Sequence, residues 1–365
     1  MEKIKVLVVD DSAFMRKLIQ DFFSGNPRFQ VVGTARNGQD AIKKVSELKP
    51  DVVTMDIEMP ILNGLEALKI IMKENPTPIV MLSSTTYEGA ENTVLAIQLG
   101  AVDFIAKPSG AISLDLHKIK EELFEKVISA SKVNMKQLVK LPTLGKKNLK
   151  TNQNYSKIEP NDRMQKPLKE SSWNATAKKI ICIGTSTGGP RALQHVITKL
   201  PKNLGAPVLI VQHMPPGFTK SLAHRLDSLS EITVKEAEDG EMIKKGTAYI
   251  APGGYHLKVK QTGSNLTVQL DQTPARNGHR PSVDVLFESI SEITDHAKIA
   301  VVMTGMGSDG SLGLQALKKK GIVKAIAESK ETSIVFGMPK AAILTNQVDE
   351  VQNVECIAES IMKYV

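Results

Sequence analysis

Residues 179–197 read KIICIGTSTGGPRALQHVI, and this stretch decides the fold of the chain around it. Four apolar residues in a row, 180–183, are typical of a strand that is buried on both faces of a sheet. The small residues at 184–189 allow a tight turn, and Pro190 suits the first turn of a helix. A buried strand that turns directly into a helix predicts an α/β fold with a parallel sheet.

The rest of the C-terminal half repeats this strand-to-helix pattern. Further strand-like runs lie at 208–212, 299–304 and 323–327. Helix-like segments begin near Pro190, Thr219, Val283 and Leu312. We therefore predict a doubly wound, mostly parallel α/β domain over residues 179–365. Residues 233–270 are punctuated by glycines and rich in β-formers, so we expect β-hairpins there.

The N-terminal half alternates short β-branched runs with amphipathic helical stretches. The strand-like runs are 5–9, 31–35, 52–55, 78–82 and 102–105. Five such units predict one doubly wound domain with a five-stranded parallel sheet over residues 1–130.

The segment 131–178 differs from both halves in composition. It carries eleven basic and three acidic residues, a net charge of +8 that equals the net charge of the whole chain. Polar residues dominate it and no apolar period runs through it, so we expect a flexible basic linker. The two folded domains are then neutral overall and the linker has few aromatic residues, so nucleic acid is not an expected partner.

Composition also limits the class of protein. No run reaches about 18 apolar residues, so we expect no membrane insertion and a cytoplasmic location. Cys182 and Cys356 lie far apart and lack metal-ligand spacing, so neither a disulfide framework nor a zinc site is expected.

Acidic residues end two strands of the N-terminal domain. Asp10 and Asp11 follow the first strand and Asp56 follows the third, so the three carboxylates should meet at the carboxyl edge of the sheet. Oxygen ligands of this kind suit Mg²⁺. Lys107 and Ser83, at the ends of the fifth and fourth strands, would complete an aspartyl-phosphate site. Each residue alone could instead cap a helix or face solvent.

Three strand ends of the C-terminal domain carry the parts of a serine nucleophile. Ser186 lies in a G-x-S-x-G turn, where the N-terminus of the next helix can stabilise an oxyanion. His213 directly follows one strand and Asp309 lies in the glycine loop after another, which predicts a base and an orienting acid. The glycine turn could instead cradle a phosphate or hold no ligand, and Asp309 could cap a helix.

The order of these three residues along the chain is informative. Ser, His, Asp differs from the Ser, Asp, His order of α/β-hydrolases, which argues against a lipase-like enzyme. Among the other histidines, His256 and His279 lie in the irregular region and are possible substrate contacts.

The N-terminal residues resemble the two-component receiver domain over about residues 1 to 125. The motif residues stand, in order, at the junctions after the first, third, fourth and fifth strands: Asp10-Asp11, Asp56 with Met59-Pro60 and Gly64, Ser83, and Lys107-Pro108. The resemblance implies a flavodoxin-like fold in which Asp56 accepts a phosphoryl group from a chemotaxis histidine kinase.

The receiver resemblance also assigns roles around Asp56. It implies that Mg²⁺ is held by Asp11, Asp56 and the backbone carbonyl of Glu58, with Asp10 assisting through water. Lys107 would pair with the phosphoryl oxygens, and Ser83 would move to hydrogen-bond one of them. Phe104 would be the aromatic side chain whose rotamer reports the switch.

The C-terminal half is similar to the chemotaxis protein-glutamate methylesterase family, and with the receiver and linker the match spans nearly the whole chain. The matching segments are 184–190, 212–218, 251–254, 280–284 and 303–310. The resemblance implies hydrolysis of glutamate γ-methyl esters on methyl-accepting chemotaxis receptors, and deamidation of receptor glutamines, through an acyl-enzyme on Ser186.

The methylesterase resemblance adds roles around the nucleophile. His213 would be the base and Asp309 its orienting acid, and the backbone N–H of Thr187 or Met306, or both, would stabilise the oxyanion. The Thr187 hydroxyl would help to fix His213, and Arg280 is a possible substrate contact. No cofactor is expected for ester hydrolysis.

Two other functions compete with this interpretation. A catalytically silent adaptor at receptor arrays would need the same receiver, but the intact serine, histidine and aspartate argue against it. A DNA-binding response regulator is disfavoured because the output half shows no helix-turn-helix pattern. For the enzyme, we expect the unphosphorylated receiver to shield the cleft around Ser186.

Overall fold

The computed structural model describes residues 2–107, 114–133, 135, 138, 173 and 177–365. In the N-terminal half, strands and helices alternate without exception. They are β1 (Ile4–Val9), α1 (Ala13–Ser24), β2 (Phe29–Ala35), α2 (Gly38–Leu48), β3 (Val52–Asp56), α3 (Gly64–Glu74), β4 (Ile79–Ser83), α4 (Tyr87–Leu99), β5 (Asp103–Ala106) and α5 (Leu114–Ala130). The five predicted strands are confirmed, with ends that differ by one or two residues.

The C-terminal half begins at β6 (Lys178–Thr185), the strand of the stretch 179–197. It continues with α7 (Gly189–Ile197), β7 (Val208–Gln212), α8 (Phe218–Asp227), β8 (Thr233–Glu236), β9 (Thr247–Ile250), β10 (His256–Thr262), β11 (Asn265–Asp271) and α9 (Val283–Ser291). It ends with β12 (His296–Val302), α10 (Ser311–Lys320), β13 (Val323–Glu328), α11 (Met338–Leu344), β14 (Glu350–Gln352) and α12 (Val354–Met362).

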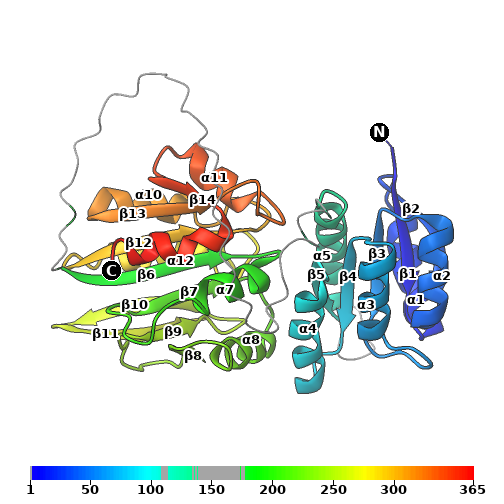
Figure 1. Cartoon of the computed structure of the whole chain (residues 1–365), viewed down its shortest axis with the longest axis horizontal. Helices are drawn as coiled ribbons and strands as arrows, with labels where there is room; N and C mark the ends of the chain where they lie inside the picture. The colour runs from blue at the N-terminus through cyan, green and yellow to red at the C-terminus, as the bar shows by residue number, and fades with distance from the viewer. Residues whose placement is uncertain (1, 108–113, 134, 136–137, 139–172, 174–176) are drawn as a thin grey trace, which may run out of the picture.

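Each half is built on one parallel sheet, as Figure 1 shows. The first sheet has the order β2-β1-β3-β4-β5, and the second has the order β14-β13-β12-β6-β7-β9-β8. Every pairing in the two sheets is parallel. Parallel strands bring all their carboxyl ends to one edge, which is where the predicted site residues lie. The predicted α/β fold class is confirmed.

The strand β6 shows why the apolar run 180–183 is continuous. All four side chains are fully buried. Ile181 and Ile183 belong to the apolar core on one face of the sheet, whereas Ile180 and Cys182 belong to the core on the other face. Since both faces of this central strand are covered, the four positions 180–183 are all apolar.

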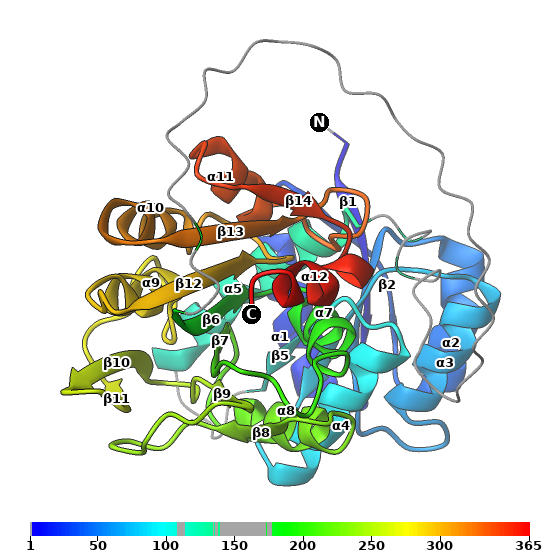
Figure 2. The same ribbon diagram turned by 60° about the vertical axis from the view of Figure 1, so that its left-hand side comes forward.

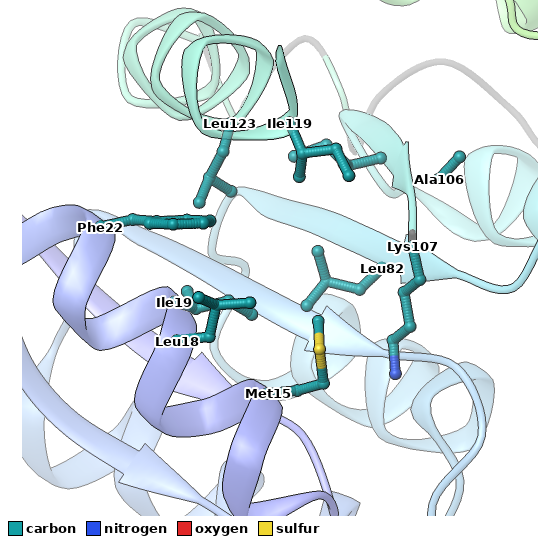
Figure 3. Close-up of a pocket in the computed structure, with 10 residues that line it drawn as sticks. Met15, Leu18, Ile19, Phe22, Leu82, Ala106, Lys107, Ile119 and Leu123 are labelled. Atoms are coloured by element: carbon teal, nitrogen blue, oxygen red, sulfur yellow. The ribbon is translucent and has the colours of Figure 1, made fainter. Parts of the chain in front are cut away.

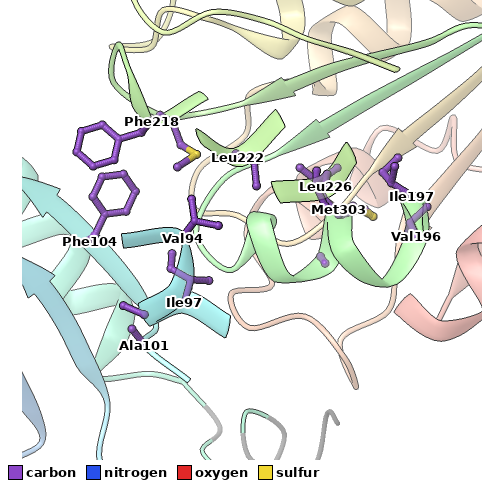
Figure 4. Packing of buried hydrophobic residues seen from close by; sticks show 14 of the residues in the cluster. Val94, Ile97, Ala101, Phe104, Val196, Ile197, Phe218, Leu222, Leu226 and Met303 are labelled. Carbon is purple, nitrogen blue, oxygen red and sulfur yellow. The ribbon is translucent and has the colours of Figure 1, made fainter. Parts of the chain in front are cut away.

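The two halves pack against each other through α4, which contacts α8 and α7 (Figures 1 and 2). Val94 and Ile97 of α4 lie in the same apolar core as Leu222 of α8. Beside them the ring of Phe104 stacks on the ring of Phe218, with centroids 4.6 Å apart. Figure 4 shows these two rings facing each other across the junction. The two domains therefore share one continuous apolar core.

The prediction of hairpins over 233–270 is only partly right. The strands β10 and β11 form the expected antiparallel hairpin. The strands β8 and β9, however, are parallel neighbours that join the main sheet beside β7. Their connection, residues 237–246, is long enough to return the chain for a parallel pairing. The expected linker, residues 131–178, lies mostly outside the described residues.

Candidate catalytic and phosphoacceptor sites

Ser186 lies at the turn between β6 and α7, and its side chain is partly exposed. Its backbone N–H donates to the carbonyl of Thr304 at 3.0 Å. Two residues later, Gly188 has a φ of +78°, which favours glycine. A Cβ at Gly188 would lie only 2.7 Å from Ile334, so only glycine fits the close approach behind the turn. The N-terminus of α7 thus stands directly behind Ser186.

His213 follows β7 and is fixed from two sides. Its backbone N–H donates to the carbonyl of Thr185 at 3.1 Å. Its Nε2 lies 2.8 Å from Oδ2 of Asp309, while its Nδ1 is buried and has no hydrogen-bond partner among the described residues. With Nε2 held by the carboxylate, Nδ1 is the ring atom left to accept a proton.

Asp309 is a buried carboxylate that receives several hydrogen bonds besides the one from His213. Donors are the Ser282 hydroxyl at 2.9 Å and the backbone N–H groups of Val283, Asp284 and Gly310 at 2.7, 3.0 and 3.1 Å. Burial opposes ionisation, but the bonds from His213 and the backbone outweigh it and hold the pKa of Asp309 well below its usual range. The carboxylate therefore stays charged and can stabilise an imidazolium at His213.

A cleft of about 680 Å³ opens over these residues. It is lined by Ser186, His213, Arg280 and Met306, and also by receiver residues such as Glu122. Since both domains line it, the cleft lies at their junction.

His279 lines the same cleft and packs on the base. Its ring stacks on that of His213, with centroids 3.8 Å apart. Burial and the neighbouring His213 together lower the pKa of His279 to about 4, so His279 is neutral at pH 7. The sequence indicated only a possible substrate contact here, because nothing in a loop sequence shows which ring it will stack on.

One predicted contact is wrong in the structure. The Thr187 hydroxyl was expected to help fix His213. It instead donates to Oδ2 of Asp103 in the receiver, at 2.5 Å. Asp103 carried no sequence signal as a site residue, since it reads as an ordinary residue of β5.

Of the predicted substrate contacts, Arg280 lines the cleft and His256 does not. Arg280 lines the cleft, and its guanidinium donates to the carbonyls of Gln272 and Thr273 at 2.8 and 3.1 Å. His256 does not line it: the side chain is fully buried, and Nε2 lies 3.2 Å from the carbonyl of Pro274. A buried histidine at the start of a hairpin strand has no path to a substrate in the cleft.

The structure brings the predicted acidic residues together at the edge of the first sheet. One oxygen each of Asp10, Asp11 and Asp56 lies within 4.8 Å of the others. Lys107 Nζ lies 3.0 Å from Oδ2 of Asp10 and 2.6 Å from Oδ2 of Asp56. Three carboxylates gathered beside Lys107 fit a hard divalent cation such as Mg²⁺.

The protonation of this pair follows from its surroundings. Burial raises the pKa of Asp56 to about 6, although Lys107 acts in the opposite direction. The pKa of Lys107 is raised despite its burial, because it faces Asp56 and Asp10. Asp56 is thus a carboxylate that few donors stabilise, beside the carboxylates of Asp10 and Asp11.

The residues expected to sense phosphorylation lie close by but point elsewhere. The Ser83 hydroxyl donates to the carbonyl of Gly89 at 2.9 Å. Phe104 is buried against Phe218. The backbone N–H of Glu58 lies 3.4 Å from Oδ1 of Asp56. Because its hydroxyl is bonded to Gly89, Ser83 would have to change rotamer before it could bond to a phosphoryl group on Asp56.

An apolar pocket lies between α1, β4 and α5, beside this site. Its lining includes Met15, Phe22, Leu82 and Leu123, and Lys107 stands at its rim (Figure 3). The pocket has a volume of only about 20 Å³, so it is a packing gap and no binding site.

Comparisons with known proteins identify one family in each half of the chain. Residues 181–361 match the family model "CheB methylesterase", and residues 6–117 match "Response regulator receiver domain". Among the described residues, no helix has the length and apolar character needed to span a membrane.

Two relatives named protein-glutamate methylesterase/protein-glutamine glutaminase match along the full chain. The protein of Geobacillus kaustophilus (strain HTA426) is 55% identical over 100% of this chain and 99% of its own. That of Halalkalibacterium halodurans is 57% identical over 99% of this chain and 98% of its own. The crystal structure of the Thermotoga maritima CheB methylesterase catalytic domain is 49% identical, with a TM-score of 0.50, and covers 52% of this chain and 100% of that domain. The chain belongs to the family of CheB methylesterases with an N-terminal receiver domain.

Proposed function

We propose that this protein removes methyl groups from glutamate γ-methyl esters of methyl-accepting chemotaxis receptors, and deamidates receptor glutamines, with Ser186 as nucleophile. The observation that carries the assignment is that Ser186 and His213 line one cleft while Asp309 holds Nε2 of His213, although the three residues follow three separate strands. The full-length relatives share the name of this activity.

In the proposed acylation step, each of these three residues has one role. Nδ1 of His213 takes the Ser186 hydroxyl proton as Oγ attacks the γ-carbonyl of the substrate. The oxyanion is stabilised by the backbone N–H of Thr187 and of Met306, neither of which donates to a backbone carbonyl within the described part of the chain. Asp309 holds the imidazolium through Nε2.

The leaving group and the second half-reaction use the same base. His213 gives its proton to the departing methanol, or to ammonia when the substrate is a glutamine, and an acyl-enzyme remains on Ser186. Water then enters, His213 removes its proton, and the product glutamate leaves as Ser186 regains its hydrogen. Every group in this cycle belongs to the chain or the substrate, so we expect no cofactor for hydrolysis.

In the receiver, we propose that Asp56 accepts the phosphoryl group from a histidine kinase. Asp11, Asp56 and the backbone carbonyl of Glu58 would hold Mg²⁺, which screens the charge that gathers as the phosphoryl group arrives. Lys107, already beside Asp56, supplies a fixed positive charge to the phosphoryl oxygens.

We further propose that the division into a receiver (1–130), a linker (131–178) and a catalytic domain (179–365) serves control. Three receiver contacts support occlusion of the cleft: Asp103 on Thr187, Phe104 on Phe218, and Ser129, whose hydroxyl donates to Sδ of Met306. Phosphorylation would weaken these contacts and open the cleft.

The experiment measures methanol release from methylated chemoreceptor membranes by wild type and by Ser186→Ala. Both proteins are assayed with and without Mg²⁺ and a small-molecule phosphodonor. We expect release that requires Ser186 and rises with the phosphodonor. Release by Ser186→Ala at the wild-type rate would contradict the nucleophile. No release by the wild type under any condition would favour a catalytically silent adaptor.

A further inference from the structure

Thr304 lies just beyond β12, behind the nucleophile turn, and is 1% exposed. Three of its polar groups are engaged. Its carbonyl accepts from the N–H of Ser186 at 3.0 Å, and its hydroxyl donates to the carbonyl of Thr187 at 2.9 Å. Its own N–H donates to Oε2 of Glu328 at 2.8 Å. One residue thus bonds both ends of the Ser186-Thr187 pair.

These two bonds have a geometric consequence for the oxyanion site. The N–H of Thr187 belongs to the peptide bond that joins the two residues. With the N–H of Ser186 held on one side and the carbonyl of Thr187 on the other, the peptide between them cannot rotate freely. Its N–H keeps one direction, and a donor to an oxyanion is effective only if it is aimed before the reaction.

Glu328 holds Thr304 from behind. It is the last residue of β13 and is 1% exposed. Its Oε1 accepts from the Thr332 hydroxyl at 3.0 Å, and its Oε2 accepts from the N–H of Thr304. It does not line the cleft around Ser186. Its hydrogen bond to Thr304 is what links this buried carboxylate to the turn that carries Ser186.

Thr304 is also held from the side opposite Glu328, by backbone groups of Val335. The N–H of Val335 donates to the Thr304 hydroxyl at 3.0 Å, and the N–H of Gly305 donates to the carbonyl of Val335 at 3.0 Å. The hydroxyl is therefore both a donor and an acceptor. Valine has nearly the same shape as threonine but can make neither bond.

We infer that Thr304 is a positioning residue for the reaction: it aims the N–H of Thr187 at the oxyanion, and Glu328 orients Thr304. The inference rests on the proposed role of Ser186, since it concerns the donor beside that nucleophile. No contact of Thr304 with substrate is required.

The test compares Thr304→Val, which loses both hydroxyl bonds, with Thr304→Ser, which keeps the hydroxyl. The readouts are kcat and KM for methanol release by the full chain. Loss of a single oxyanion donor reduces kcat about 10²- to 10³-fold, so a donor that is present but poorly aimed should reduce it about 10- to 100-fold. We expect that loss for Thr304→Val with KM within twofold of wild type, and near wild-type kcat for Thr304→Ser.

Thr219→Val is the matched control. Thr219 is also fully buried, and its hydroxyl also makes two bonds: it donates to Oε1 of Glu236 at 2.6 Å and accepts from the N–H of Gly253 at 3.0 Å. Thr219→Val should lower the melting temperature about as much as Thr304→Val but leave kcat within twofold. Equal kcat losses in the two variants would show a stability effect and overturn the inference.

A second readout separates failure of this inference from failure of the proposed function. The rate at which a fluorophosphonate probe labels Ser186 depends on the serine, its base and the oxyanion site. A wild type that neither hydrolyses ester nor takes the label would disprove the proposed nucleophile. An active wild type beside a Thr304→Val variant with unchanged kcat and labelling would disprove the positioning role alone.

If Thr304→Val does not fold, Glu328→Gln takes its place. The glutamine keeps the volume and one acceptor for the N–H of Thr304. It lacks the charge that Glu328 carries above the pKa of about 7 to which burial raises it, so kcat is measured at about pH 8. A neutral acceptor binds an N–H more weakly, so we expect a fall in kcat of about three- to tenfold with KM unchanged. An unchanged kcat would show that Glu328 does not act through Thr304.

Discussion

Asp56 and Asp309 are both buried, and both stand at the carboxyl edge of a parallel sheet, but their charges are stabilised very differently. Asp56 faces one cation, Lys107, and a second carboxylate, Asp10, so burial prevails and raises its pKa to about 6. Asp309 receives bonds from His213, a hydroxyl and three backbone N–H groups, which hold its pKa below the usual range.

The difference shows that donors, rather than burial, decide what a buried carboxylate can do. The oxygens of Asp309 are occupied, so this residue can orient and stabilise but has no lone pair free to attack. Among the described residues, the oxygens of Asp56 are bonded by Lys107 and the N–H of Glu58, which leaves lone pairs for a bond to phosphorus. The same side chain thus serves as a permanent charge in one domain and as a phosphoacceptor in the other.

The largest effect is expected from Asp309→Asn. An amide cannot accept all the bonds that the carboxylate accepts, and it cannot stabilise the imidazolium of His213. We expect kcat for methanol release to fall on the order of 10⁴-fold. The matched control is Asp295→Asn, which changes the carboxylate beside the buried His296, outside the cleft, and should change kcat less than twofold. A fall in kcat of less than tenfold for Asp309→Asn would show that Asp309 does not stabilise the imidazolium of His213.

The two carboxylates should also titrate far apart. Carboxyl ¹³C NMR without Mg²⁺ should give a midpoint near pH 6 for Asp56 and continued ionisation of Asp309 at pH 4. Because the folded pKa of Asp56 exceeds its usual value of 3.8, its charge destabilises the fold above pH 6, by up to about 3 kcal/mol. This penalty disappears as the pH falls below about 4. Overlapping midpoints for the two residues would refute the comparison.

A smaller effect is expected where the receiver reaches the catalytic domain. Asp103→Ala removes the acceptor of the Thr187 hydroxyl. A hydrogen bond of this kind contributes about 1 kcal/mol, so basal methanol release should rise about fivefold. Gln98→Ala is the control, because it removes the exposed interdomain bonds to Gln194 and Arg225 instead. A basal rate in Asp103→Ala at or below that of wild type would count against occlusion through Thr187.

The smallest effect should come from Ser282→Ala, which removes one of the donors to Asp309 and leaves the others. We expect kcat to fall about threefold. The hydroxyl of Ser282 also caps α9, so the free energy of unfolding should drop by about 1 kcal/mol. A loss of kcat as large as that of Asp309→Asn would mean that the donors act as one unit.

The fold and much of each site could be predicted because the carboxyl ends of parallel strands all lie at one edge of the sheet. Asp10, Asp56 and Lys107 follow different strands of one sheet, and the structure places them in contact. Ser186 and His213 follow adjacent strands, β6 and β7, of the other sheet. The positions along the chain were therefore enough to bring these residues to one edge.

The features that could not be predicted depend on packing between segments far apart in the sequence, which neither hydrophobic periodicity nor a motif connects. The bond from Thr187 to Asp103 joins two domains, and the stacking of His279 on His213 depends on the path of a loop. The parallel pairing of β8 with β9 replaced an expected hairpin, because the glycines between them signalled turns but not the direction in which the chain returns.

The most direct test of the link between the two aspartates compares methanol release by wild type and by Asp56→Asn. Each is assayed on methylated chemoreceptor membranes with Mg²⁺, before and after addition of a small-molecule phosphodonor. The account predicts that the wild-type rate rises on addition and that the Asp56→Asn rate stays at the basal wild-type value. An equal rise in both proteins would contradict the claim that Asp56 controls the cleft around Ser186.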